Sequence, residues 1–236
     1  MMPSMRMLLS STGFRSGAVR DALLDLLEAP PAECAIAVVI DAILPFPGGK
    51  DTMLDDLDRC RALGWKQFDV LSLFSGPRSV IESRLRAADV IFCYGGSNHW
   101  LSHAWTATGL APLLGELLDQ KVYLGMSAGS MIFSRLHSAA VDAFDDQDEV
   151  DLLELSAVGP ALPLFDWFVM PHLSAPYFEH LTDEWAADRA ARLGGPVWFI
   201  DDDSALLVRD VADDPEVVSS GHWLHFSEKG LLSSSA

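Results

Sequence analysis

Short apolar runs alternate along the chain with segments in which Leu, Val, Ile or Met recur every three or four residues. The runs predict buried strands at 5–9, 34–40, 68–74, 90–94, 121–124, 167–170 and 197–200. The helical spacing predicts helices at 17–27, 51–63, 79–88, 99–108, 112–118 and 178–192. Because strands and helices alternate, we expect an α/β fold with a doubly wound, mostly parallel sheet flanked by helices.

The C-terminal third departs from this rhythm. Residues 205–208 continue extended after the last predicted strand, 216–226 predict a terminal hairpin, and 231–236 predict a frayed tail. An acidic segment at 142–154 predicts a solvated loop or helix face. No repeat or linker interrupts the chain, so we expect a single domain over residues 1–236.

Composition limits the partners of this 236-residue chain. It has 16 Lys and Arg against 34 Asp and Glu, a formal net charge of −18. A chain this negatively charged is not expected to bind nucleic acid or anionic membranes. No apolar run reaches the roughly 20 residues of a membrane helix. The three cysteines, at 34, 60 and 93, lack metal-ligand spacing and fit reduced core thiols of a cytoplasmic protein. Cys93 lies in an apolar strand and is expected to pack in the core.

The sequence Gly125-Met126-Ser127-Ala128-Gly129 lies between a predicted strand and a helix-compatible segment. Gly-x-Ser-x-Gly at such a crossing is the nucleophile-elbow pattern, in which a tight turn exposes the serine hydroxyl. The turn also leaves the amide of Ala128 free to stabilise an oxyanion. A second glycine pair, Gly95-Gly96, directly follows the strand at 90–94. Ligand sites in such sheets lie beyond the carboxyl ends of the strands, and both segments fall there.

A nucleophilic serine needs a base and a group that orients the base. His172 is the preferred base among the seven histidines, because Pro171 fixes the chain as it leaves a predicted strand. His180 is expected on an exposed helix, and His222 and His225 are expected at the surface. The acid is expected among Asp201, Asp202 and Asp203, which follow the strand at 197–200, and the pattern alone does not choose between them.

Four blocks of this chain, in order, resemble peptidase family S51, which includes aspartyl dipeptidase and cyanophycinase. They are Tyr94-Gly95-Gly96-Ser97-Asn98, Gly125-Met126-Ser127-Ala128-Gly129-Ser130, Met170-Pro171-His172 and Ile200-Asp201-Asp202-Asp203-Ser204-Ala205-Leu206. The resemblance spans roughly residues 5 to 226 and implies a fold related to class I glutamine amidotransferase domains.

The resemblance implies that Ser127 is the nucleophile, His172 the base and Asp202 the acid, where the family usually has glutamate. It implies that the amides of Gly96 and Ala128 form the oxyanion hole, and Gly95, Ser97 and Asn98 are expected to contact a small peptide substrate. No metal or cofactor is expected.

The segments linked to substrate choice differ from the family pattern. Aspartyl dipeptidases carry a Thr-Arg-x-x-Arg-type segment after the histidine, whereas residues 181–185 here read Leu-Thr-Asp-Glu-Trp, with no arginine until Arg189. Ala139-Ala140-Val141-Asp142 replaces the Thr-Thr-Asn-Asp that follows the elbow. The sequence therefore predicts a dipeptidase-like serine hydrolase and does not support specificity for N-terminal aspartate.

Two other functions remain open from the sequence. An α/β-hydrolase esterase, which uses the order Ser, acid, His, could pair Ser127 with Asp166 and either His222 or His225. A non-catalytic sensor or binding domain could retain the same fold. The sequence also leaves open whether the chain forms a homodimer.

Overall fold

The computed structural model describes residues 5–227 and 229–235. Its strands are β1 (Arg6–Ser10), β2 (Ala35–Val39), β3 (Gln67–Leu71), β4 (Val90–Cys93), β5 (Val122–Met126), β6 (Phe168–Met170), β7 (Val197–Ile200), β8 (Ser204–Val208), β9 (Glu216–Ser219), β10 (Trp223–Ser227) and β11 (Gly230–Ser234). Within the described residues, seven strands form a larger sheet in the order β3-β2-β4-β5-β1-β8-β9. Pairing is parallel from β3 to β1 and antiparallel at β8 and β9, which confirms the predicted α/β fold.

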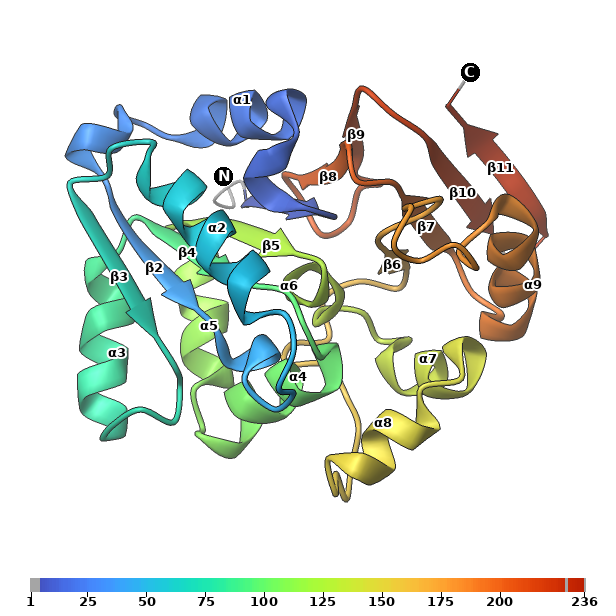
Figure 1. The fold of residues 1–236 in the computed structure, drawn as a ribbon, viewed down its shortest axis with the longest axis horizontal. Coiled ribbons are helices and arrows are strands. Elements are labelled where there is room, and N and C mark those ends of the chain that lie inside the picture. Colours follow the sequence, from blue (N-terminus) through green and yellow to red (C-terminus); the bar gives the residue numbers. More distant parts are fainter. Residues whose placement is uncertain (1–4, 228, 236) are drawn as a thin grey trace.

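Helices cover both faces of the larger sheet (Figure 1). They are α1 (Gly17–Leu26), α2 (Lys50–Arg61), α3 (Arg78–Ala87), α4 (Asn98–Ala107), α5 (Ala111–Leu118), α6 (Ala128–Met131), α7 (His137–Phe144), α8 (Gln147–Leu152) and α9 (Asp183–Leu193). Short 3₁₀ turns lie at η1 (Gly13–Arg15), η2 (Pro31–Glu33) and η3 (Asp41–Ile43). Helices α1 and α2 lie on one face, and α3, α4 and α5 lie on the other.

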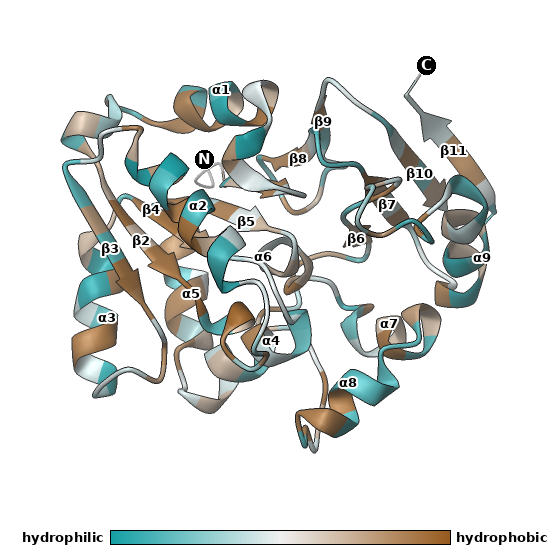
Figure 2. Ribbon diagram, viewed as in Figure 1, coloured by the Kyte–Doolittle hydropathy of each residue, from teal (hydrophilic) through white to brown (hydrophobic). Residues whose placement is uncertain are grey.

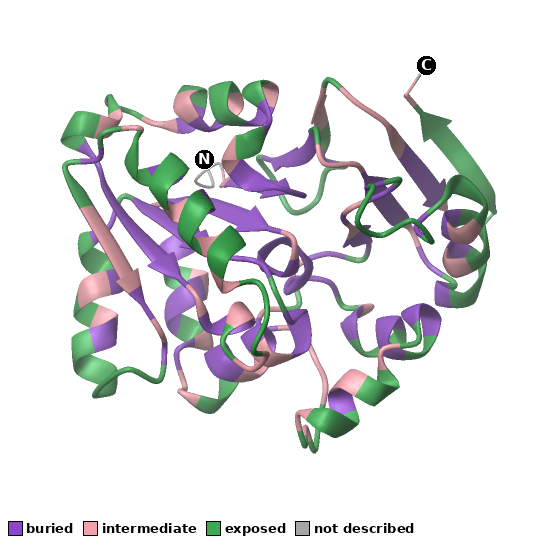
Figure 3. Ribbon diagram, in the orientation of Figure 1, coloured by how far each residue is buried: buried purple, intermediate pink, exposed green. Residues whose placement is uncertain are grey.

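The strands separate two apolar clusters, because successive side chains of a strand point to opposite faces. In β1, Leu8 packs with the α1 and α2 side, while Met7 and Leu9 pack with the α3, α4 and α5 side. Figure 2 shows apolar strands between helices of mixed character, and Figure 3 shows the same strands buried. Each central strand is therefore apolar on both faces, as the unbroken runs predict.

A second sheet, which the sequence did not predict, lies beside the larger one. Its order in the described residues is β11-β10-β7-β6. Strands β6 and β7 are parallel, with Met170 opposite Phe199, and β10 pairs antiparallel with both β7 and β11. The segments that carry His172 and Asp202 therefore leave the second sheet, whereas Ser127 leaves the larger one.

Three predictions about the C-terminal part are wrong. Residues 216–226 do not form a hairpin, because β9 pairs with β8 in the larger sheet while β10 joins the second. Residues 231–235 are not a frayed tail, since β11 pairs with β10; the prediction for residue 236 lies outside the described residues. The helix expected at 178–192 begins only at Asp183, where Thr182 accepts a hydrogen bond from Trp185 N as its N-cap.

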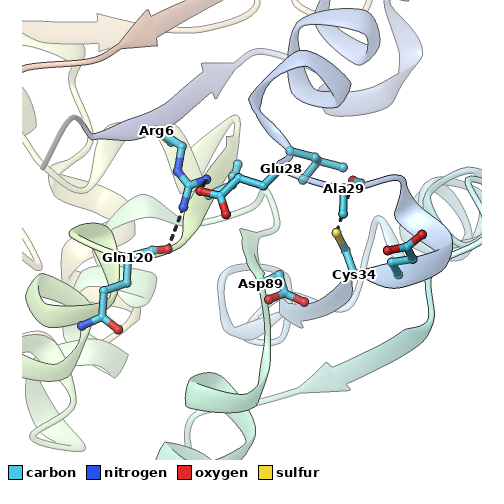
Figure 4. Close-up of a pocket in the computed structure, with 9 residues that line it drawn as sticks. Arg6, Glu28, Ala29, Cys34, Asp89 and Gln120 are labelled. Atoms are coloured by element: carbon cyan, nitrogen blue, oxygen red, sulfur yellow. Dashed lines mark hydrogen bonds and ion pairs between the residues drawn. The ribbon is translucent and has the colours of Figure 1, made fainter.

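The opposite end of the larger sheet has a hollow of about 210 Å³ at the amino ends of its strands (Figure 4). Three of its charged side chains bond to protein atoms: Arg6 contacts Glu28 at 2.7 Å and the Gln120 carbonyl at 2.7 Å, and Asp89 accepts from the Ala35 amide at 2.8 Å. None of the helices in the described ranges is both long and apolar enough to span a membrane.

Candidate active site

Ser127 occupies the turn between β5 and α6. Its backbone has φ 49° and ψ −116°, a strained conformation for a residue with a side chain and the one that a nucleophile elbow requires. The flanking glycines permit the close approach of neighbouring chain segments: a Cβ on Gly129 would lie 2.1 Å from the Cys93 carbonyl oxygen, and one on Gly125 would lie 2.6 Å from the Gly129 oxygen. The Ser127 amide donates to the Ser10 carbonyl at 2.9 Å, which ties the turn to β1.

The Ser127 hydroxyl meets the imidazole of His172, and the imidazole meets the carboxylate of Asp202. His172 Nε2 lies 2.9 Å from Ser127 Oγ, and His172 Nδ1 lies 2.8 Å from Asp202 Oδ1. An ionised carboxylate only accepts hydrogen bonds, so we assign the proton of the neutral ring to Nδ1. Nε2 is then a free acceptor that faces the hydroxyl. The three side chains that the sequence named are therefore in sequential hydrogen-bond contact.

Two residues that sequence reasoning missed complete the surroundings of Asp202. Ser11, which follows β1, donates to Asp202 Oδ1 at 2.9 Å and accepts from the His172 amide at 3.0 Å. The Tyr177 hydroxyl donates to Asp202 Oδ2 and lies 3.0 Å from His172 Nδ1. Burial alone would raise the pKa of Asp202, but the hydrogen bonds from His172, Tyr177 and Ser11 outweigh it and lower that pKa. The carboxylate is thus held ionised beside the imidazole.

The neighbouring aspartates have other surroundings. Asp201 accepts from the Ser204 hydroxyl at 2.5 Å and from the His222 amide at 2.5 Å, so it holds the loop to β8 and β10. Asp203 is exposed. Among these three residues, the geometry singles out Asp202 as the one beside His172.

The Gly95-Gly96 loop, which follows β4, lies against the serine turn. A Cβ on Gly95 would be 3.1 Å from Ser127 Cβ, and Gly96 adopts φ +133°. The Gly96 amide has no backbone acceptor among residues 5–227 and 229–235, and Ala128 is the first residue of α6, where an amide has no partner within the helix. Both amides are therefore available to an incoming oxygen.

Ser97 and Asn98, which were expected to contact substrate, lie at the start of α4. The Ser97 hydroxyl accepts from the Trp100 amide at 2.9 Å as the N-cap of α4 and donates to Glu149 Oε1 at 2.5 Å. Asn98 is buried. Neither is among the described residues that line the cavity beside Ser127, whereas Gly95 and Gly96 are.

That cavity has a volume of about 570 Å³. Ser127 and His172 lie on its wall together with apolar side chains, Ile43, Met126 and Phe178 among them, and with the guanidinium of Arg15. No group of three or more His, Cys, Asp or Glu placed to hold a metal ion occurs within the described ranges. The polar side chains of the described lining are the imidazole of His172, the guanidinium of Arg15 and the hydroxyls of Thr12, Thr52, Tyr94, Ser127 and Tyr177.

The residues of the esterase alternative bond elsewhere. Asp166 pairs with Arg135 at 2.9 Å in solvent, and His222 Nε2 lies 2.9 Å from Asp183 Oδ1. His225 is buried and stacks on Trp198 with ring centroids 3.7 Å apart, so the expectation of a surface position is wrong for it. His180 is exposed as expected but lies in a turn, not on a helix.

The sequence carried a signal for one of the two missed residues. Ser11 follows the first strand at the same sheet edge as Ser127, within Ser10-Ser11-Thr12-Gly13, and could have been recognised as a polar group at a strand end. Tyr177 had no such signal, because its position depends on a turn after His172 that has no regular periodicity. Its side chain is half exposed and lies over the ring of His172, with centroids 5.6 Å apart.

Comparison with known proteins shows what this chain is similar to. Residues 49–213 match the model of peptidase family S51. An uncharacterized peptidase of Pasteurella multocida (strain Pm70) is 26% identical over 155 residues, covering 65% of this chain and 70% of that protein. The crystal structure of a putative peptidase E from Listeria monocytogenes EGD-e superposes with a TM-score of 0.73 at 19% identity, covering 92% of this chain and 100% of that one. A peptidase from an acI-B1 actinobacterium gives a TM-score of 0.69 at 17% identity, covering 100% and 98%.

Proposed function

This chain belongs to peptidase family S51 and is a peptidase, and we propose that it hydrolyses short peptides with Ser127 as nucleophile, His172 as base and Asp202 as the group that orients the base. The single observation that carries the proposal is the sequence of hydrogen bonds at 2.9 Å and 2.8 Å that joins the three side chains. Such a constellation is recognised by its geometry and not by residue order.

In the proposed reaction, Ser127 Oγ attacks the carbonyl carbon of the peptide bond as His172 Nε2 takes its proton. The imidazolium that forms is stabilised by Asp202, whose lowered pKa keeps it negatively charged. His172 then gives the proton to the leaving amine, so the C–N bond breaks and an acyl-serine remains. Water repeats the attack with His172 again as base, which releases the acid and restores the hydroxyl.

The amides of Gly96 and Ala128 are the proposed donors to the oxyanion of each tetrahedral intermediate. Both lie at the carboxyl ends of adjacent strands, β4 and β5, and neither is needed by the backbone of its own loop. Donors that are fixed before the reaction need no reorganisation when the charge develops, and loss of one costs about 10²–10³ in rate.

A dipeptide or another short peptide fits the size of the cavity. Its volume of about 570 Å³ lies within the ~300–1,000 Å³ of typical small-molecule sites. The Tyr177 and Phe178 side chains come from the turn that follows His172 and help to line it. We therefore infer a dipeptidase-like enzyme, with no inferred preference for N-terminal aspartate.

The test is hydrolysis of a dipeptide library by the wild-type protein and by Ser127→Ala and His172→Ala. Each variant should lose several orders of magnitude in kcat/KM, because nucleophile and base act as a unit. A fluorophosphonate probe should label Ser127 in the wild type. Ser83→Ala, on the exposed face of α3, is the matched control and should behave as wild type. Unchanged hydrolysis by folded Ser127→Ala would reject the assignment.

A further inference from the structure

The cavity beside Ser127 has one permanently charged side chain among the described residues that line it, that of Arg15. Arg15 comes from η1, which follows β1, and thus from a different segment than the nucleophile or the base. The chain as a whole carries a formal net charge of −18. An anionic group could therefore enter this cavity only against the surrounding field, unless a local cation receives it.

The guanidinium of Arg15 is held in place from behind by Asp56 of α2. Nε and Nη2 of Arg15 each lie 2.9 Å from one oxygen of that carboxylate, the two-pronged geometry that fixes the plane of a guanidinium. The Asp56 side chain is only 5% exposed. Because Asp56 is buried, the guanidinium of Arg15 is held in one position: moving it away would leave a buried carboxylate with fewer hydrogen-bond partners.

Asp56 accepts hydrogen bonds from two further side chains, one of them a second arginine. Arg59 Nη1 lies 3.1 Å from Oδ1, and the Tyr94 hydroxyl donates to Oδ2 at 2.8 Å. Two guanidinium groups thus face one carboxylate, and the cluster keeps one positive charge. The hydrogen bond to Asp56 also raises the pKa of Arg15 despite partial burial, so the residue stays charged.

Nη1 of Arg15 remains without a hydrogen-bond partner in the described part of the chain, since the bonds to Asp56 use Nε and Nη2. The side chain is 32% exposed. The described lining of the cavity contains hydroxyl side chains but no Asp or Glu that could compete for this donor. A fixed guanidinium with an unused donor edge is the arrangement that binds a carboxylate.

We propose that Arg15, fixed by Asp56, binds a carboxylate of the peptide substrate and so makes the enzyme selective for peptides that present a negative charge in this cavity; the proposal rests on the peptidase function proposed above. The carboxylate can be the C-terminal group of a dipeptide or an acidic side chain, and both supply the same two oxygens. Arg15 is thus a substrate-binding residue that determines specificity and takes no part in proton transfer.

The experiment compares two pairs of peptides that differ only in the carboxylate. Ala-Ala is compared with Ala-Ala-amide, and Asp-Ala with Asn-Ala, in wild type and in Arg15→Met. In the wild type, removal of the recognised carboxylate should lower kcat/KM about 10- to 100-fold, the usual effect of losing a charge-assisted hydrogen bond. In Arg15→Met the two members of that pair should be hydrolysed equally. The loss for the charged peptide should appear in KM, and kcat for the neutral peptide should change little. The pair that discriminates identifies the source of the carboxylate.

Arg84→Met is the matched control, because Arg84 makes the same two-pronged contact with Asp69, at 2.8 Å and 2.6 Å, on the far side of the larger sheet. It should keep the wild-type preference. Arg15→Lys serves if Arg15→Met does not fold, and it should retain a reduced preference, since it keeps the charge and loses the fixed plane. Equal hydrolysis within both pairs by the wild type, or an undiminished preference in folded Arg15→Met, would overturn the proposal.

Binding separates this proposal from the peptidase mechanism. Calorimetric titration of Ser127→Ala and of Ser127→Ala/Arg15→Met with the same four peptides measures the contribution of the carboxylate without turnover. If Ser127→Ala binds with a preference that Arg15→Met removes, but the wild type hydrolyses none of the four peptides, the mechanism is rejected and the carboxylate site is retained. Hydrolysis without such a preference, or no detectable binding of any of the four peptides, would reject the site.

Discussion

Replacement of Gly96 by alanine tests the link between backbone geometry and the proposed oxyanion hole. A Cβ at this position would lie 2.3 Å from the Ala42 carbonyl oxygen, 2.5 Å from its carbon and 2.8 Å from the Ile43 nitrogen. Ala42 belongs to η3, which is anchored because the buried Asp41 accepts from Ser72 Oγ and the Leu73 amide, both at 2.8 Å. The glycine loop must therefore move by roughly 1 Å to reach ordinary van der Waals contact.

The same substitution forces alanine to adopt φ +133°, a strain of about 1–3 kcal/mol that rotation of the peptide can relieve. Either response moves the Gly96 amide away from the place where the oxyanion forms. We expect kcat to fall about 10²–10³-fold, with a smaller effect on KM, because the lost interaction is made in the transition state.

The assay is steady-state hydrolysis of a dipeptide that the wild type cleaves, with thermal unfolding measured on the same samples. Gly159→Ala is the control, since nothing lies within 4 Å of its added Cβ, and it should retain wild-type kcat. Folded Gly96→Ala with wild-type kcat would refute the assignment of this amide to the oxyanion hole.

Two further perturbations test groups around the site. Tyr177→Phe removes one of the hydrogen bonds that outweigh burial and lower the pKa of Asp202, so that pKa should rise and the acid limb of the pH–rate profile should move to higher pH; an unmoved limb would contradict this role. His137 is buried, and burial followed by the neighbouring His99 lowers its pKa from 6.5 to about 4. Because the unfolded chain binds this proton more readily, stability should fall as the pH drops from 6.5 to 4, by about 3 kcal/mol from this residue alone. Urea unfolding across that range should show a smaller loss in His137→Gln, and identical losses would disprove it.

The central sheet could be predicted because its strands are apolar on both faces and separated by helices of clear periodicity. The second sheet could not. The apolar runs predicted β6 and β7 as strands but did not show that they pair in a separate sheet. Strand β11 is exposed along its whole length and has no hydrophobic pattern that distinguishes it from a loop. The hairpin expected at 216–226 did not form, although the turn chemistry was suitable, because β9 pairs with β8 in the larger sheet and β10 pairs with β7 in the second sheet.

The contact between Ser127 and His172 could be anticipated from strand ends, since both residues follow buried strands. The support of Asp202 by Tyr177, and of Arg15 by Asp56, could not. Each depends on side chains from irregular turns or from helix faces whose relative placement is set by tertiary packing. Asp56 in particular lies in a charged helical segment, α2, where solvent exposure was the natural expectation, and yet its side chain is 5% exposed.

The three side chains of the site come from two sheets: two follow strands of the second sheet and one follows a strand of the larger sheet. His172 and Asp202 follow neighbouring parallel strands of the second sheet, and Asp202 also lies two residues before β8 of the larger sheet. The contact between His172 and Ser127 instead crosses from the second sheet to the larger one. The Ser11 hydroxyl donates to Asp202 Oδ1 at 2.9 Å and the Thr12 hydroxyl donates to the Asp202 carbonyl at 2.7 Å, and these bonds also join the two sheets. A slight parting of the two sheets would consequently separate Ser127, the proposed nucleophile, from His172, the proposed base, while both sheets stay folded. Enzymatic competence would then disappear under milder stress than secondary structure, and the loss would reverse as soon as the sheets came back together.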